Sequence, residues 1–356
     1  MPTERRVTAV LVVLVSLALA ACGGRAAPAP CQPCAPSVPV AAHYVDADDN
    51  SLEKYDAIWS ALQRFYRSES PANIRVRYRP SGPSMFDVPS STVVISLSSL
   101  EKSSLRATIA HESSHLFLAA LTEGASTLDE LRFIDEGLAS VLGYEIDGQL
   151  APYQARAVRL AAGRMKEAPI TFERVARWPT FFGSGGKNLD WGAYDVGASF
   201  VFYLRDEVGD ARLVDLLRSL GRTRSLEASA RQVLGRSLSE LESGWHAYVG
   251  KAKVDVPKLI DQSPQTLSQA VSTTRSEISV TFDVDMAPIV CLMTPCQEGI
   301  CFDHARWKTE RTLVVAIERP LLPKHTYRLA LGVPSCRLRS RAGDELPVTE
   351  WSFETE

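Results

Sequence analysis

The spacing of the hydrophobic residues changes near residue 256, and this change constrains the fold more than any other feature of the chain. From Ser104 to about Val254 apolar residues recur at helical spacing, whereas from Ile278 onward they alternate. Two short apolar runs before the helical part, Ile74–Tyr78 and Thr92–Leu97, are predicted strands. A small amount of sheet, a helical body and then alternating runs indicate an α+β chain rather than repeated βαβ units.

The chain of 356 residues is long enough for about two folded domains. We predict a mainly helical domain over residues 44–255 and a small antiparallel β-sandwich over residues 273–356. A linker over residues 256–272, rich in Pro, Ser, Thr and Gln, is expected to join them. The formal net charge of −3 differs from the strongly basic character of nucleic-acid-binding proteins, so we expect no nucleic-acid partner.

The N-terminus has the pattern of a secretory signal peptide. Arg5 and Arg6 precede an almost entirely apolar run, Val7–Ala21, that is too short to span a bilayer. Small residues end the run, as they do at a signal-peptide cleavage site. We therefore predict that residues 1–21 are a signal peptide, with an uncleaved anchor as the alternative.

The end of this segment, Leu19–Cys22, resembles a bacterial lipobox. That resemblance implies lipidation of Cys22 and attachment of the mature chain to a membrane through its N-terminal lipid. Gly23 after the cysteine implies a location in the bacterial cell envelope, at the outer membrane facing the periplasm. An ordinary signal peptide followed by an incidental cysteine is the alternative.

A tether is predicted over residues 22–43, where Gly, Ala and Pro dominate and no packed core can form. Cys31 and Cys34 lie inside it and are expected to form a local disulfide rather than a redox centre. Disulfides are also expected in the C-terminal part, because exported proteins oxidise their cysteines. The sequence leaves the pairing open among the four C-terminal cysteines, which are Cys291, Cys296, Cys301 and Cys336.

The predicted helix that begins near Ser104 carries the pattern His111-Glu112-x-x-His115. Residues four apart lie on the same face of a helix, so both histidines can bind one Zn²⁺ ion. Glu112, on the adjacent flank, can take a proton from the attacking water and return it to the leaving group. Two solvent-facing histidines on an ordinary helix are the alternative, but a chance match is rare in a chain with six histidines.

The surroundings of this motif also favour a metal site. Ser103 or Ser104 is a candidate N-cap, and the apolar residues that follow predict a helix facing the core. A catalytic zinc site needs three protein ligands and one open position. Glu136, about twenty residues after His115, can supply the third ligand if its helix folds back antiparallel on the first.

The motif at residues 111–115, followed by Asp135–Ala139, resembles the gluzincin metallopeptidases of the MA clan and, more narrowly, the bacterial peptidase MA-like family. The likeness extends from Tyr44 to Val249 and implies a zincin-like domain that hydrolyses peptide bonds. The implied zinc ligands are His111, His115 and Glu136. The metzincin pattern is excluded, because Leu118 and Leu121 stand where it needs a glycine and a third histidine.

Further polar residues are candidates for the site. The family resemblance implies that Tyr194 donates a hydrogen bond to the oxyanion; simple packing is the alternative. Asp135 is expected either to orient a ligand histidine or to favour its helix N-terminus. His246 is a second candidate donor, although helix packing is the better interpretation. The remaining nearby acids are expected to be solvated in the connecting loop; they are Glu123, Asp129 and Glu130.

The alternating segment resembles the bacterial Ig-like domains of secreted and surface-layer proteins. The matching stretches are Ile278–Met286, Leu321–Leu331 and the last six residues, WSFETE. This resemblance implies a module that holds the helical domain away from the membrane or engages an envelope partner. The Gly-rich stretch Gly183–Lys187 lacks a preceding strand, so it is interpreted as a rim or lid rather than a phosphate site.

Together these features predict a zinc metallopeptidase anchored to the envelope, acting on a protein or peptide substrate. The rival interpretation is a non-catalytic envelope scaffold or adaptor with a structural zinc site. Glu112 favours the enzyme, because a structural site has no need of a general base.

Overall fold

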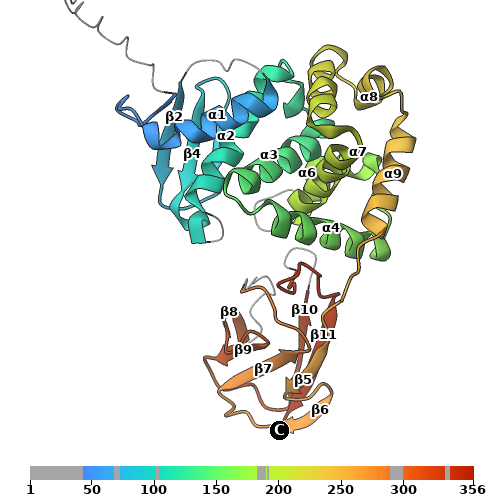
Figure 1. Ribbon diagram of the computed structural model, residues 1–356. Coiled ribbons are helices and arrows are strands. Elements are labelled where there is room, and N and C mark those ends of the chain that lie inside the picture. Colours follow the sequence, from blue (N-terminus) through green and yellow to red (C-terminus); the bar gives the residue numbers. More distant parts are fainter. Residues whose placement is uncertain are drawn as a thin grey trace, which may run out of the picture. The chain divides into compact units, whose positions relative to one another are not determined.

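The computed structural model describes residues 43–67, 73–101, 104–182, 190, 192–288, 300–332 and 337–356 (Figure 1). The chain is α+β, as predicted, with a small sheet, a helical body and two further sheets in chain order. None of the helices in these ranges is both long and apolar enough to cross a bilayer. The predicted signal peptide, Cys22, the tether cysteines and Gly183–Lys187 lie outside the described residues. So do Cys291, Cys296, Cys336 and the side chain of Cys301, so the disulfides stay predictions.

The first sheet has the order β1-β2-β4-β3. Strands β1, β2 and β4 are parallel, and β3 pairs antiparallel with β4. Apolar residues of β2 and β4, such as Val76 and Val93, are buried in one cluster with Trp59 and Leu62 of helix α1. The bounds are β1 Tyr44–Val45, α1 Asp56–Tyr66, β2 Ile74–Arg79, β3 Met85–Asp87 and β4 Thr92–Ser96.

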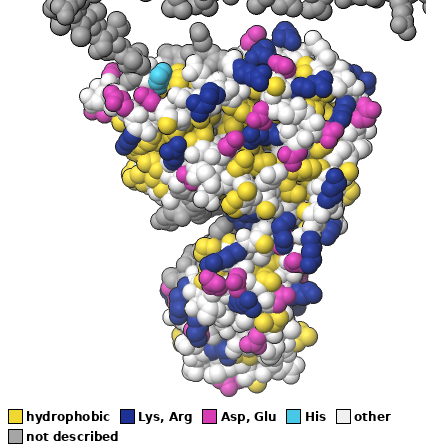
Figure 2. Space-filling view, viewed as in Figure 1, with side chains coloured by type: hydrophobic (Ala, Val, Ile, Leu, Met, Phe, Trp, Pro, Cys, Tyr) yellow, Lys and Arg dark blue, Asp and Glu magenta, His cyan; other side chains and the backbone are white. Residues whose placement is uncertain are grey.

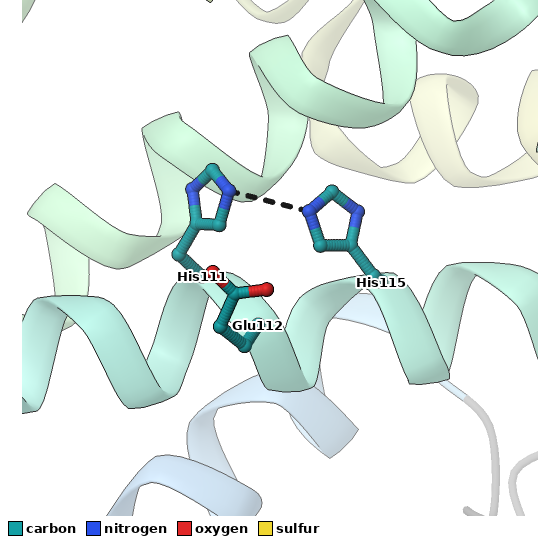
Figure 3. Close-up of side chains that lie close together, drawn as sticks. All are labelled: His111, Glu112 and His115. Atoms are coloured by element: carbon teal, nitrogen blue, oxygen red, sulfur yellow. Dashed lines mark hydrogen bonds between the residues drawn. The ribbon is translucent and has the colours of Figure 1, made fainter. Parts of the chain in front are cut away.

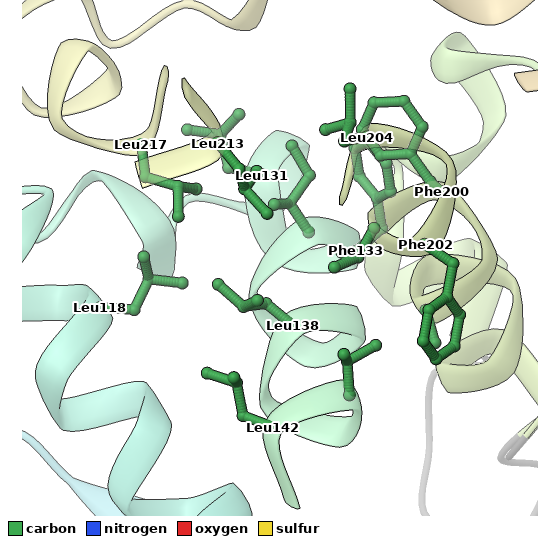
Figure 4. Close-up of a cluster of buried hydrophobic side chains, with 14 of the residues drawn as sticks. Leu118, Leu131, Phe133, Leu138, Leu142, Phe200, Phe202, Leu204, Leu213 and Leu217 are labelled. Atoms are coloured by element: carbon green, nitrogen blue, oxygen red, sulfur yellow. The ribbon is translucent and has the colours of Figure 1, made fainter. Parts of the chain in front are cut away.

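The helical body follows this sheet and packs around α3. Apolar side chains from α2, α3 and α7 meet in one cluster, shown in Figure 4 with Leu118, Leu138 and Phe200 among its members. Helix α7 is broken at Gly209, whose φ of 76° lies in the region that favours glycine. The bounds are α2 Leu105–Leu121, α3 Arg132–Ile146, α4 Leu150–Glu167, α5 Phe172–Val175, α6 Trp178–Phe182, α7 Gly192–Thr223, α8 Leu226–Leu234 and α9 Leu238–Gly250.

Helices α3 and α7 touch backbone to backbone at a pair of glycines. A Cβ atom on Gly137 would overlap the carbonyl of Gly197, and a Cβ on Gly197 would overlap the carbonyl of Phe133. Only residues without a side chain allow this approach. The glycine that follows Glu136 in the sequence therefore has a packing role, because it brings α7 against the helix that carries Glu136.

The C-terminal part contains two sheets that share a separate hydrophobic cluster, including Phe282, Tyr327 and Trp351. One sheet, β5-β7-β9-β8, is antiparallel throughout; in the other, β10-β11-β6, the β11–β6 pair is parallel. The range predicted as a linker, 256–272, contains β5 and β6. The β-sandwich and its Ig-like character stay predictions. The bounds are β5 Leu259–Ser263, β6 Ser268–Val271, β7 Glu277–Phe282, β8 Ile300–Trp307, β9 Thr312–Ile317, β10 Thr326–Leu331 and β11 Thr349–Thr355.

Charged side chains of both signs are interspersed on the face of the molecule in Figure 2. Among the described residues many charged side chains form ion pairs, such as Arg205 with Glu145 and Asp210. Such mixing is typical of an ordinary solvated protein surface. The expected absence of a nucleic-acid partner stays a prediction.

Candidate metal centre

Helix α2 holds the histidine motif and is buried on most sides. Of the two candidate N-caps, Ser104 caps it, accepting a hydrogen bond from the Ala107 amide at 2.9 Å. The buried hydroxyl of Ser114 pairs with the hydroxyl of Tyr66 at 2.6 Å. A polar side chain on such a helix must find a partner inside the protein, because water does not reach it.

The two motif histidines converge on one side of α2. His111 Nε2 lies 3.2 Å from His115 Nε2, and the rings point toward one another in Figure 3. The spacing of four residues puts them one turn apart on a shared face. The side chain of His115 is buried, whereas that of His111 is 21 % exposed. The pair is therefore open to solvent on the His111 side.

Glu136 of α3 completes a cluster of three converging atoms. Its Oε2 lies 3.3 Å from His111 Nε2 and 3.3 Å from His115 Nε2. This oxygen is buried and makes no hydrogen bond of suitable geometry. A buried carboxylate oxygen that converges with two imidazole nitrogens in this way is placed to bind a cation together with them.

The two helices meet in the antiparallel arrangement that the sequence predicted. Near the start of α2, Arg106 donates to the carbonyl of Ile146 at the end of α3. Near the other end of α2, His115 contacts Asp135 at the start of α3. Because α3 folds back in this way, Glu136 lies opposite the histidines despite the intervening loop.

The three atoms fit a tetrahedral metal site. Zinc binds nitrogen and oxygen ligands at about 2.0–2.1 Å, so two ligands of a tetrahedron lie roughly 3.3–3.4 Å apart. The three separations here are 3.2, 3.3 and 3.3 Å. Two imidazoles and one carboxylate are also a donor set that zinc takes in catalytic sites. His111, His115 and Glu136 could therefore hold one zinc ion and leave a fourth position open.

Asp135 fixes the orientation of His115. Its Oδ1 lies 2.7 Å from His115 Nδ1, and both side chains are buried. Burial alone would lower the pKa of His115, but Asp135 and Glu136 outweigh it and raise that pKa to about 10. With its Nδ1–H donated to Asp135, the ring presents Nε2 to the other two atoms. Of the two roles expected for Asp135, the geometry supports the orientation of a histidine.

Glu112 lies beside the three atoms. Together His111, Glu112 and His115 each place one possible ligand atom within 4.8 Å of the others. Glu112 belongs to the neighbouring flank of α2, and its side chain is buried. Burial raises the pKa of this carboxyl, against the opposing effect of the two histidines. A carboxylate with raised proton affinity beside a metal position suits a general base better than a ligand.

Tyr194 lies near the histidines, in the first turn of α7. Its ring centroid is 6.1 Å from that of His111, and it packs edge-on against Trp178 at 5.9 Å. Burial raises the pKa of Tyr194 well above its usual range, and the charges of Glu136 and Glu112 raise it further. The phenol therefore keeps its proton and can act as a hydrogen-bond donor.

The remaining predicted residues do not join this cluster. His246 Nε2 lies 2.7 Å from the carbonyl of Ile170, which is the packing role that the sequence favoured. Glu123, Asp129 and Glu130 are exposed, as expected.

Two residues of the site were missed by sequence reasoning. Arg132 donates to Asp135 Oδ2 at 2.6 Å and to Glu136 Oε1 at 2.7 Å. Phe86 on β3 stacks on His115 with ring centroids 4.2 Å apart. Arg132 precedes the two acids by three and four residues, a spacing that predicts ion pairs on a helix and could have identified it. No sequence pattern indicates Phe86, which reaches the site from the edge strand.

Comparison with known proteins gives matches among solved structures only. No family model matches the chain, and no curated protein matches it. The chain is similar to the M1 zinc metallopeptidase from Deinococcus radiodurans, at 18% identity and a TM-score of 0.37, over 60% of this chain and 48% of that chain. A mutant of that enzyme bound to a Tyr-Ser-Ala substrate matches at 18% identity and a TM-score of 0.38, with the same coverage.

The N-terminal part of the bacterial S-layer protein SbsC matches at 11% identity and a TM-score of 0.20, over 85% of this chain and 78% of that chain. The chain spans about half the length of the metallopeptidases that it matches.

Proposed function

We propose that this protein is a zinc-dependent hydrolase of peptide bonds, with His111, His115 and Glu136 as the zinc ligands. One observation carries the proposal. Glu136 Oε2 is buried and converges with the Nε2 atoms of both histidines, each 3.3 Å away, without a hydrogen bond of suitable geometry to either. A divalent cation between these atoms would stabilise an arrangement that is otherwise costly.

Glu112 is the general base of the proposed reaction. Bound zinc would supply a Lewis acid that makes a water molecule acidic at neutral pH. Glu112 then takes the proton from the attacking water and delivers it to the nitrogen of the leaving amine. Its raised pKa matches both steps, since a carboxyl must hold the proton between them. A structural zinc site would not require a buried acid in this position.

Tyr194 is the proposed donor to the developing oxyanion. Its phenol stays protonated, and its ring lies next to that of His111. A preorganised donor of this kind contributes about 10²–10³ in rate. Tyr194→Phe should therefore lower kcat by that factor and leave zinc affinity unchanged. An unchanged kcat would assign Tyr194 to packing.

The proposal extends to the location of the protein. We propose that Cys22 is lipidated and anchors the chain in the envelope, with the C-terminal sheets facing a partner or spacing the helical domain from the membrane. The observations behind it are the lipobox-like sequence and the Pro- and Ala-rich segment that follows. Radioactive palmitate should label the wild-type protein in cells but not Cys22→Ser; equal labelling contradicts lipidation.

Zinc content and peptide turnover test the central proposal. Purified protein should contain about one zinc ion per chain, since the site has three ligands and one open position. It should also cleave members of a mixed peptide library, followed by mass spectrometry. Glu112→Gln should keep the zinc and lose about 10²–10⁴ in rate. Glu130→Gln, which alters an exposed acid, is the matched control and should behave as wild type.

Three results would decide against the proposal or in favour of its rival. Protein that contains no zinc after reconstitution would contradict the proposed metal site. Full peptidase activity of Glu112→Gln would contradict the role of Glu112 as general base. Stoichiometric zinc without cleavage of any peptide would instead support the scaffold with a structural zinc.

A further inference from the structure

Arg132 contacts both acids at the start of α3. Its Nη1 donates to Asp135 Oδ2 at 2.6 Å, and its Nη2 donates to Glu136 Oε1 at 2.7 Å. Each carboxylate therefore has one oxygen on Arg132 and the other directed at the histidines. Asp135 Oδ1 takes the Nδ1–H of His115, and Glu136 Oε2 faces both Nε2 atoms.

The same guanidinium also packs on the ring that supports His115. Its central carbon lies 5.2 Å from the ring centroid of Phe86, within the range of a cation–π contact. Phe86 in turn stacks on His115, with centroids 4.2 Å apart and planes 22° apart. Arg132 thus touches three of the groups that set the positions of the Glu136 and His115 ligand atoms.

Apart from its ion pairs with Asp135 and Glu136, the place of Arg132 in α3 is electrostatically unfavourable. It is the first residue of α3, where the helix dipole disfavours a positive charge. Its side chain is also largely buried, at 22 % exposure, so solvent compensates little of its desolvation. Both facts favour a role in the site over a role in helix formation.

We infer that Arg132 is a positioning residue of the proposed metal centre. Its guanidinium holds the carboxylates of Asp135 and Glu136 in place. As a result, Glu136 Oε2 and His115 Nε2 point to the same position. The inference rests on the proposed zinc function and deepens it. The guanidinium is planar and offers parallel donors to two carboxylates at once. The lysine ammonium lacks this geometry, so the lysine of Arg132→Lys should not hold both carboxylates as the arginine does.

Zinc affinity is the first readout, measured on the full chain by competition with a chelator. Arg132→Gln should weaken zinc binding about 10- to 100-fold, the usual effect of removing a group that orients metal ligands. Arg132→Lys should weaken it in the same direction. Arg132→Lys keeps the positive charge and serves as the folded variant should Arg132→Gln fail to fold.

Arg205 provides a matched control. It also bridges two carboxylates, Glu145 at 2.7 Å and Asp210 at 2.7 Å, and its side chain is 13 % exposed. Neither partner faces a histidine of the site. Arg205→Gln should leave zinc affinity within about twofold of wild type, whatever it does to stability. Equal weakening by the two Gln variants, or unchanged affinity in both Arg132 variants, would overturn the inference.

A second readout does not depend on zinc. In chelator-treated protein, the Nδ1–H of His115 should give a downfield proton NMR signal, assigned by its loss in His115→Ala. Arg132→Gln or Arg132→Lys should broaden or shift this signal, because Asp135 loses its anchor, and Arg205→Gln should not. An unmoved signal in the Arg132 variants contradicts the inference. Wild-type protein that binds no zinc but shows the arginine-dependent signal would instead contradict the proposed function alone.

Discussion

The two ends of helix α3 carry similar charges but very different sites. At the N-terminal end Arg132 bridges Asp135 and Glu136, and at the C-terminal end Arg205 bridges Glu145 and Asp210. Both are an arginine between two carboxylates at hydrogen-bond distance. Counting ion pairs would therefore not tell a functional centre from a structural one.

The two ends of α3 differ in how deeply their carboxylates are buried and in what their oxygens contact. The side chains of Asp135 and Glu136 are 1 % and 6 % exposed, whereas those of Glu145 and Asp210 are 38 % and 47 % exposed. At the exposed end water can form hydrogen bonds with any carboxylate oxygen that the arginine does not contact. At the buried end water does not reach Glu136 Oε2, which instead faces two imidazole nitrogens. This buried acceptor, which converges with two imidazole nitrogens, marks the candidate ligand site better than charge does.

The largest contrast is expected when one carboxylate is removed from each end. Glu136→Ala removes one of the three proposed protein ligands and should weaken zinc binding at least about a hundredfold, since even in four-ligand structural sites each ligand carries on the order of 3 kcal/mol. Glu145→Ala should leave zinc affinity unchanged. Chelator competition on both variants measures the difference. Equal affinities would place the third ligand elsewhere.

A smaller effect is expected from the glycine next to Glu136. Gly137→Ala forces a Cβ into the backbone of Gly197, and overpacking of this kind costs about 1–3 kcal/mol of unfolding free energy. Gly163→Ala in α4 is the control, because its Cβ would meet only a Val254 methyl at 3.8 Å. That substitution should be neutral or stabilising by up to about 1 kcal/mol. Urea unfolding measures the free energy of unfolding of both variants. Equal values would show that α7 shifts to accommodate the added methyl group without cost.

The sequence was most informative where chemistry and helix geometry coincide. The spacing from His111 to His115 requires a shared helix face, and the observed 3.2 Å between their Nε2 atoms agrees with it. Glu136 could be placed opposite them only by assuming an antiparallel return, which the short connection favours. The N-cap at Ser104 likewise follows from local hydrogen bonding.

What the sequence could not give depends on tertiary contacts. Phe86 reaches His115 from an edge strand, and nothing local in the chain sets that distance. The role of Gly137 becomes apparent only when Gly197 lies against it. The strands within the expected linker, 259–271, have weak alternation of their own and form by pairing with β7 and β11.

The last prediction is a proton count that separates the buried end of α3 from the exposed one. Asp135 and Glu136 raise the pKa of His115 to about 10 despite its burial, so without metal the ring carries an extra proton at neutral pH. A zinc ligand must present a free Nε2, so binding should release about one proton from His115. Below about pH 10 zinc affinity should therefore rise about tenfold per pH unit, and above it level off.

Calorimetry in buffers of different ionisation enthalpy would count the proton. The Glu112→Gln variant is the suitable background, because burial also raises the pKa of Glu112 and its proton would be counted too. Adding Asp135→Asn should lower the release at pH 8, since His115 loses the first of its two stabilising acids. Adding Asp210→Asn, at the exposed end, should leave the count unchanged. Zinc binding without proton release in the Glu112→Gln background would mean that His115 is already neutral and that the two ends differ in burial alone.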